Sequence, residues 1–162
     1  MYHFKNSKMP NTYTQLLVQI VFAVKGRSNL IKSNHRDELE KYICGIISNH
    51  NCKPLSLYCN PDHIHILIGL HPSKCISDLV RDIKTGSTKF INEKKWVVGK
   101  FSWQEGFGAF SYSKQSLDNV SKYILNQPEH HKKKSFKEEY LNLLNEFKIE
   151  FNENYLFDWI DL

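Results

Sequence analysis

The sequence has no apolar run long enough to cross a membrane, because charged and polar residues interrupt every hydrophobic stretch of its 162 residues. A transmembrane helix needs about 20 consecutive, mostly apolar residues, so a membrane-spanning protein is excluded. Residues 1–10 also lack the apolar core of a secretory signal peptide. We therefore expect a cytoplasmic protein.

Paired cysteines are lacking as well: the chain has four cysteines, none of them in a C-x-x-C pair. In a cytosolic protein this favours free thiols without a structural role. The chain also lacks repeats, low-complexity tracts and an interdomain linker, and its 41% hydrophobic content argues against disorder. We expect one domain over residues 1–162, with a core at about 12–128 and a basic turn, a helix and an acidic tail at 129–162.

Charge is distributed unevenly along the chain. Residues 138–162 contain seven acids and one lysine, a net charge of −6, which leaves +11 for residues 1–137 out of a total of +5. A basic body with an acidic tail is typical of a protein that binds a polyanion, although lysines that only solvate the surface give the same pattern. Charge alone does not choose between DNA, RNA and acidic lipid.

Hydrophobic periodicity indicates an α+β fold. The expected strands are at 12–24, 54–59, the histidine-containing run from 63 and 107–112, and the expected helices are at 35–49, 76–94, 117–127 and 136–147. Pro128 should end the third helix, because the residue before a proline avoids helical dihedrals. The first six elements match the ferredoxin-like split βαβ arrangement, an antiparallel sheet with two helices on one face. The opposite face remains open for the third helix to lie across.

Two histidines lie in the strand that follows the turn at residues 60–62. Because side chains alternate on a strand, His63 and His65 point to the same face as Leu67, and the isoleucines between them point to the helix-covered face. Two imidazoles side by side on an open face suit a divalent cation.

The third helix carries further candidate groups. Tyr123 and Gln127 are four residues apart and share one face, so a phenol and an amide oxygen can enter the same pocket as the two imidazoles. Three protein ligands leave positions open for substrate, as a catalytic metal site requires.

Two other readings of the histidines are possible. A structural zinc site would combine them with Cys59 and perhaps Cys75, but these cysteines form no paired knuckle. A histidine-triad hydrolase needs a third alternating histidine, and Leu67 occupies that position.

The motifs resemble those of the single-tyrosine HUH transposases, the IS200-like family that includes the REP-associated tyrosine transposases of bacterial chromosomes. His63-Ile64-His65 matches the His-hydrophobic-His motif, and residues 123–127 match the tyrosine-helix motif. The similarity also covers residues 18–22 and 103–108. The chain departs from it at Gln19, where relatives often have histidine, and the segment after residue 138 has no counterpart that we can map.

The resemblance implies a DNA transposase of the bacterial cytosol. Tyr123 would attack a backbone phosphate of single-stranded DNA with hairpin ends, forming a 5′-phosphotyrosine and freeing a 3′-hydroxyl. His63, His65 and Gln127 would hold Mg²⁺ or Mn²⁺ on that phosphate. The family is also dimeric, and the tyrosine helix is usually exchanged between subunits, with residues 111–115 as a hinge. A binding module that grips hairpin DNA or RNA without cutting it remains the alternative.

Several other side chains receive an expected place. The expected DNA-binding residues are basic residues of the second helix and of the run at 130–134, namely Arg81, Lys84, Lys89, Lys94, Lys132 and Lys133. We expect His130 and His131 to lie in an exposed basic turn and not to be metal ligands. Trp103, Phe107 and Phe110 are expected in the core rather than as base-stacking platforms.

Overall fold

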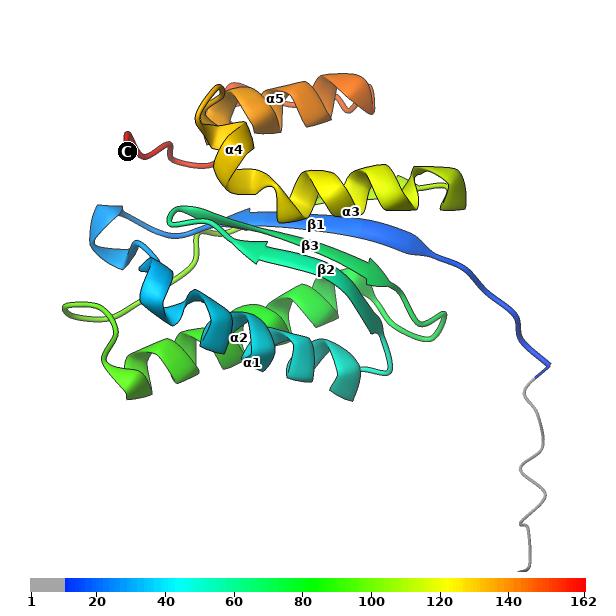
Figure 1. The fold of residues 1–162 in the computed structure, drawn as a ribbon, viewed down its shortest axis with the longest axis horizontal. Coiled ribbons are helices and arrows are strands. Elements are labelled where there is room, and N and C mark those ends of the chain that lie inside the picture. Colours follow the sequence, from blue (N-terminus) through cyan, green and yellow to red (C-terminus); the bar gives the residue numbers. More distant parts are fainter. Residues whose placement is uncertain (1–10) are drawn as a thin grey trace, which may run out of the picture.

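The computed structural model describes residues 11–162, which fold into a four-stranded antiparallel sheet with helices on both faces (Figure 1). The strands are β1 (Leu17–Ala23), β2 (Lys53–Cys59), β3 (His63–Gly69) and β4 (Gly108–Tyr112), in the order β2-β3-β1-β4. This arrangement confirms the predicted ferredoxin-like fold class. The predicted absence of a signal peptide concerns residues 1–10, which lie outside the described residues.

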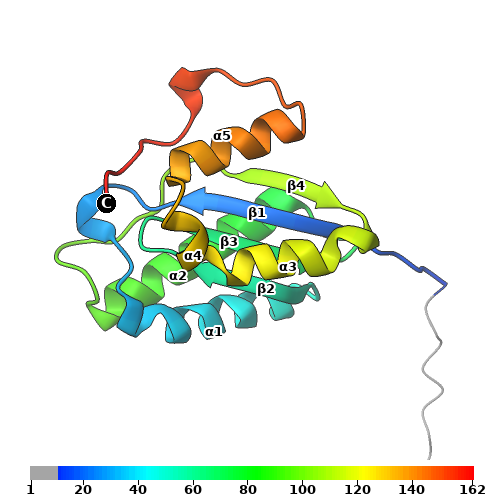
Figure 2. The ribbon, with the colours of Figure 1, turned by 45° about the horizontal axis from the view of Figure 1, so that its top comes forward.

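The helices form two layers. In chain order they are α1 (Ser33–Asn49), α2 (Ile76–Lys94), α3 (Leu117–Leu125), α4 (Gln127–His131) and α5 (Phe136–Glu146), with short 3₁₀ turns at Arg27–Asn29, Lys114–Ser116 and Glu153–Tyr155. Helices α1 and α2 cover one face of the sheet, and α3, α4 and α5 lie over the other (Figure 2). Within residues 11–162, no helix is both long and apolar enough to span a membrane.

The alternation of β3 separates the main core from the opposite face. Ile64, Ile66 and Ile68 are fully buried in the main hydrophobic core, which they share with Leu39 of α1 and Ile83 of α2. Strand β3 lies between β1 and β2, so its histidines are placed in the middle of the sheet on the other face. The face that α1 and α2 cover therefore forms the main hydrophobic core.

Helix α3 lies over the opposite face through a small apolar cluster. Leu67 of β3 packs against Val120 and Ile124 of α3. The hydroxyl groups of Ser56 in β2 and Ser121 in α3 are also hydrogen-bonded. These contacts fix the rotation of α3, so its tyrosine lies beside the histidine pair.

The segment after α3 differs in part from the prediction. Helix α3 ends at Leu125, two residues earlier than predicted, and Gln127 and Pro128 begin a new helix, α4, that includes His130 and His131, whereas Lys132 and Lys133 form the expected turn. A proline in the first turn of a helix costs no hydrogen bond, because the first amides have no helical partner. The first strand is also shorter than predicted, since residues 12–16 are exposed and only Leu17–Ala23 pairs in the sheet.

Helix α5 packs closely on the sheet beside α3. Phe136, Tyr140, Leu143 and Leu144 are all buried beneath it. Gly108 of β4 permits the approach, because a β-carbon there would lie 2.8 Å from the Tyr140 hydroxyl. The N-terminus of α5 has a complete capping box between Ser135 and Glu138.

The last residues hold α5 in place. Gln104 donates from Nε2 to the carbonyl of Asp158, and its Oε1 accepts from the Asp158 amide. Phe157 and Trp159 pack against the aromatic side chains of α5. Trp103 and Phe110 are buried in the main core, as predicted.

Candidate metal and tyrosine site

His63 and His65 are both buried on the face covered by α3 and α5, where they contact Tyr123, Phe136 and Glu139. The Nδ1 of His63 donates to Asp62 Oδ1 at 2.6 Å, which leaves its Nε2 facing away from the strand. Burial lowers the pKa of His63, but the hydrogen bonds to Asp62 and Glu139 outweigh it and raise the pKa above its usual value. Burial lowers the pKa of His65, because its partners compensate less.

Gln19 of β1 is fully buried beside His65. Its Nε2 donates to His65 Nδ1 at 2.8 Å, and its Oε1 accepts from the Tyr112 hydroxyl at 2.7 Å. Gln19, where the chain departs from the family resemblance, therefore hydrogen-bonds an imidazole of the site and orients its ring.

Glu139 of α5 occupies the centre of the site, and sequence reasoning missed it. Its side chain is 2% exposed, and Oε1 accepts from His65 Nε2 at 2.7 Å. The same oxygen lies 3.3 Å from His63 Nε2, while Oε2 accepts from the Tyr123 hydroxyl. Burial would raise the pKa of this carboxyl, but the neighbouring imidazoles, that of His65 first, hold it well below its usual value.

A sequence pattern for this residue exists. Glu139 is in phase with Phe136, Tyr140 and Leu143, the apolar stripe of α5. An acid within an apolar stripe is buried only when it has partners, so this position was recognisable as a candidate.

Helix α4 brings three more side chains to the cluster. Gln127 is fully buried, its Oε1 accepts from Asn60 Nδ2 at 3.0 Å and its Nε2 donates to Glu139 Oε2 at 3.1 Å. His131 Nε2 lies 3.5 Å from Glu139 Oε1, and His130 Nε2 lies 2.9 Å from Oε2. The prediction that His130 and His131 lie in an exposed turn is wrong, because both belong to α4 and are partly buried, and His131 lies among the possible metal ligands.

Tyr123 lies beside the histidines of its own chain. Its ring centroid is 5.8 Å from that of His65, and its hydroxyl donates to Glu139. Burial, followed by the negative charge of Glu139, raises the pKa of the phenol well above its usual value. The hydroxyl is therefore protonated in this arrangement.

The cluster has the donor set of a cation site. The possible ligand atoms of His63, His65, His131 and Glu139 all lie within 4.8 Å of one another. The Nδ1 of His63 is occupied by Asp62, and that of His131 by the carbonyl of Lys134 at 2.8 Å. In neutral rings both Nε2 atoms then carry lone pairs, yet they lie 3.2 Å apart. Electron pairs this close need a proton or a cation between them, and the donor set of three imidazoles and one carboxylate fits a divalent cation.

The structure rules out the zinc reading with cysteines. Cys59 is buried on the α1 side of the sheet, where its amide donates to Glu40, and burial raises the pKa of its thiol. Cys75 is exposed just before α2. Among residues 11–162, no group of possible metal ligands includes a cysteine.

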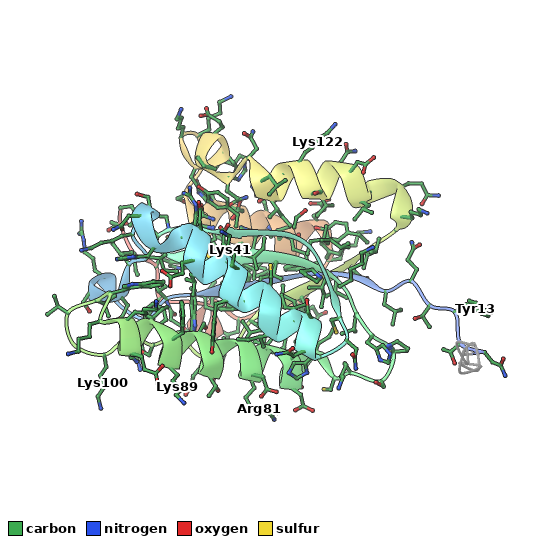
Figure 3. All side chains as sticks on the ribbon, turned by 60° about the horizontal axis from the view of Figure 1, so that its bottom comes forward. Tyr13, Lys41, Arg81, Lys89, Lys100 and Lys122 are labelled. Atoms are coloured by element: carbon green, nitrogen blue, oxygen red, sulfur yellow. The ribbon has the colours of Figure 1, made fainter. Side chains whose placement is uncertain are left out.

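The predicted DNA-binding residues of α2 lie on the face away from the site, as Figure 3 shows for Arg81 and Lys89. Arg81 pairs with Asp78 and Asp82, and Lys94 with Glu38. These cations lie on the other side of the sheet from the histidines, because α2 covers the opposite face, and their role in DNA binding stays a prediction.

Lys84 of α2 has a structural environment. Its Nζ donates to the carbonyls of Gln104 and Gly106, at 2.8 and 2.6 Å, and lies over the ring of Phe22. Burial lowers the pKa of Lys84 to about 8.

The lysines of the basic run have a different position. Lys132 and Lys133 line a cavity of about 430 Å³ together with Asp62, His131 and Phe136. This cavity adjoins the histidine cluster through His131, and a role of Lys132 and Lys133 in DNA binding stays a prediction.

Comparison with known proteins agrees with the fold and the motifs. The family model for IS200-like transposases matches residues 12–127. The ISDra2 transposase TnpA of Deinococcus radiodurans is 24% identical over 120 residues, which cover 70% of this chain and 84% of that protein. His131 and Glu139 lie beyond the residues that the family model matches.

Two solved structures share the fold. A protein of Deinococcus radiodurans assigned as a transposase superposes with a TM-score of 0.57 at 22% identity, over 75% of this chain and 97% of that chain. A REP-associated tyrosine transposase bound to a REP hairpin also gives 0.57, at 16% identity, over 77% of this chain and 74% of that chain. The family model covers well over half of the sequence, and the chain therefore belongs to the IS200-like transposase family.

Proposed function

We propose that the protein is a metal-dependent single-stranded DNA endonuclease and strand transferase that acts in transposition through Tyr123. The observation that carries the proposal is that Tyr123 and the pair His63 and His65 contact the same carboxylate, that of Glu139. A nucleophile and a set of cation ligands are thus within reach of one phosphate.

The reaction is an exchange of phosphate esters. The Tyr123 oxygen attacks the phosphorus, the bond between phosphorus and the 3′-oxygen breaks, and a 5′-phosphotyrosine forms. The phenol gives up its proton, and the departing 3′-oxygen gains one to become a hydroxyl. Attack by another 3′-hydroxyl reverses these steps and joins strands, so no nucleotide cofactor is required.

The site residues have separate tasks in this scheme. Mg²⁺ or Mn²⁺ held by His63, His65 and Gln127 would supply charge neutralisation at the phosphate oxygens. Asp62 keeps the His63 ring oriented, and Gln19 does so for His65. Glu139 accepts from the Tyr123 hydroxyl and so keeps the phenol beside the histidines.

The contacts of Tyr123 support assembly of the site within one chain. Its hydroxyl and His65 already lie on either side of a carboxylate from the same chain. Exchange of the tyrosine helix between two copies, which the resemblance implies, is the competing arrangement, and the homodimer stays a prediction.

The substrate we propose is single-stranded DNA with hairpin ends. The REP-associated tyrosine transposase with the same fold was solved with a REP hairpin. In this chain the cavity beside His131 carries Lys132 and Lys133, which suit a phosphate backbone.

The test incubates the protein with end-labelled hairpin DNA and Mn²⁺, followed by a denaturing gel. A covalent protein–DNA band that Tyr123→Phe removes supports the proposal. Tight binding without any adduct would instead support the non-cleaving module.

A further inference from the structure

The unexplained group of this site is the carboxylate of Glu139. It belongs to α5, outside the region that the family model matches. Its two oxygens face different groups: Oε1 faces the imidazoles of His65, His63 and His131, and Oε2 accepts from Tyr123 and Gln127. One side chain thus connects the cation ligands with the nucleophile.

Two explanations fit a carboxylate at this point. It can be a permanent part of the site, or it can occupy the place of the scissile phosphate and leave when DNA binds. The first requires that α5 be firmly packed, and the second that it separate easily.

The packing of α5 favours a permanent place. Four of its apolar and aromatic residues are buried, and Tyr140 packs closely against Gly108, which has no β-carbon. Phe136 stacks on the ring of His63 with centroids 3.8 Å apart, directly in front of the site. Removing α5 would expose all of these apolar side chains to water, which disfavours its separation from the sheet.

The positions of the nitrogen and oxygen atoms around His131 support a role of His131 and Glu139 as cation ligands. His131 Nε2 faces both His63 Nε2 at 3.2 Å and Gln127 Oε1 at 2.9 Å, and its Nδ1 is occupied by Lys134. Glu139 Oε1 completes the same group with the only negative charge among those ligand atoms.

We propose that Glu139 and His131 are additional ligands of the cation, and that Glu139 is also the positioning residue of Tyr123. The positioning part rests on the proposed function, whereas the ligand part does not. Three imidazoles and one carboxylate suit Mn²⁺ better than Mg²⁺, which prefers oxygen ligands.

The first experiment measures Mn²⁺ binding to the full chain without DNA, by the electron paramagnetic resonance signal of free Mn²⁺. We compare the wild type with Glu139→Gln, and with Glu138→Gln as a matched control whose side chain is exposed on the same helix. We expect Glu139→Gln to weaken Mn²⁺ binding at least about tenfold and Glu138→Gln to leave it unchanged. Circular dichroism checks folding, and His131→Ala provides the same test should Glu139→Gln not fold.

The second experiment measures the single-turnover rate of adduct formation at saturating Mn²⁺ and DNA. A positioning role predicts a rate at least about tenfold lower in Glu139→Gln, with the DNA affinity unchanged. Unchanged Mn²⁺ affinity in both Glu139→Gln and His131→Ala would overturn the ligand part. Equal or faster adduct formation in Glu139→Gln would overturn the positioning part and show that the carboxylate blocks the phosphate position. A wild-type protein that makes no adduct, but loses Mn²⁺ with Glu139→Gln, refutes the proposed function while the ligand assignment stands.

Discussion

Gln19 of β1 donates to His65 Nδ1 at 2.8 Å, although the two residues are 46 positions apart in the sequence. A cation bound at His65 Nε2 requires a proton on Nδ1, and then an acceptor at Gln19. A half-turn of the amide provides one, so Gln19 can serve both forms of the ring.

Replacement of Gln19 therefore tests support of the imidazole. Leucine has a similar size but no polar atoms, so Gln19→Leu leaves His65 Nδ1 without a partner. We expect Mn²⁺ affinity to fall about tenfold, measured by calorimetry without DNA. Gln15→Leu, an exposed change before the same strand, is the control. Equal affinities in all three proteins would show that Gln19 does not support the ligand.

Assembly of the site within one chain can be tested by mixing two inactive variants. Tyr123→Phe lacks the nucleophile, and His63→Ala lacks a predicted ligand. Exchange between copies would place an intact tyrosine against an intact histidine pair in some mixed dimers. We expect no adduct from the mixture on a denaturing gel, because Tyr123 serves the histidines of its own chain. Recovery of adduct on mixing would instead establish exchange.

The basic residues after α4 and those of α2 should differ in their effect on DNA binding. Lys132 and Lys133 adjoin the histidine cluster, whereas Arg81 and Lys89 lie on the opposite side of the sheet. We expect Lys132→Gln and Lys133→Gln each to reduce the dependence of log affinity on log salt by about 1. The measurement is fluorescence anisotropy with labelled hairpin DNA over a salt series.

Arg81→Gln and Lys89→Gln serve as the control pair for that measurement. Both positions are exposed and paired with acids of their own helix. A larger change of slope in these variants than in the Lys132 and Lys133 variants would place the DNA on the α2 face.

Two glycines test how closely α5 packs on the sheet. A β-carbon at Gly108 would lie 2.8 Å from the Tyr140 hydroxyl, whereas one at Gly45 in α1 meets no atom within 4 Å. We expect Gly108→Ala to lower the free energy of unfolding by about 1–3 kcal/mol. Gly45→Ala should raise it by about 0.5–1 kcal/mol, because alanine is the better helix former. Urea unfolding curves measure both, and an unaffected Gly108→Ala protein would mean that α5 packs loosely.

The sequence predicts those parts of the site that depend on local periodicity. Alternation along a strand places His63 beside His65, and helical spacing places Tyr123 beside Gln127. Both predictions rest on local spacing in the sequence and require no knowledge of the tertiary structure. The structure brings all four side chains to one cluster.

Other parts depend on how distant elements pack and were not predicted. Glu139 is 74 positions from His65 in the sequence and contacts it only because α5 packs on the face of the sheet opposite α1 and α2. The inward position of His131 follows from the break at Asn126 and from the new helix that begins at Gln127. The position of the α2 lysines relative to the histidines could not be predicted, because the charge of a helix face does not indicate which side of a sheet it covers.

The most direct test of the account is to identify the residue that becomes attached to DNA. The protein is incubated with hairpin DNA and Mn²⁺, digested with nuclease and protease, and the peptides are sequenced by mass spectrometry. We predict a phosphodeoxynucleotide on Tyr123 and on no other tyrosine. A modified residue elsewhere, or cleaved DNA without any modified peptide, would contradict the assignment of Tyr123 as the nucleophile.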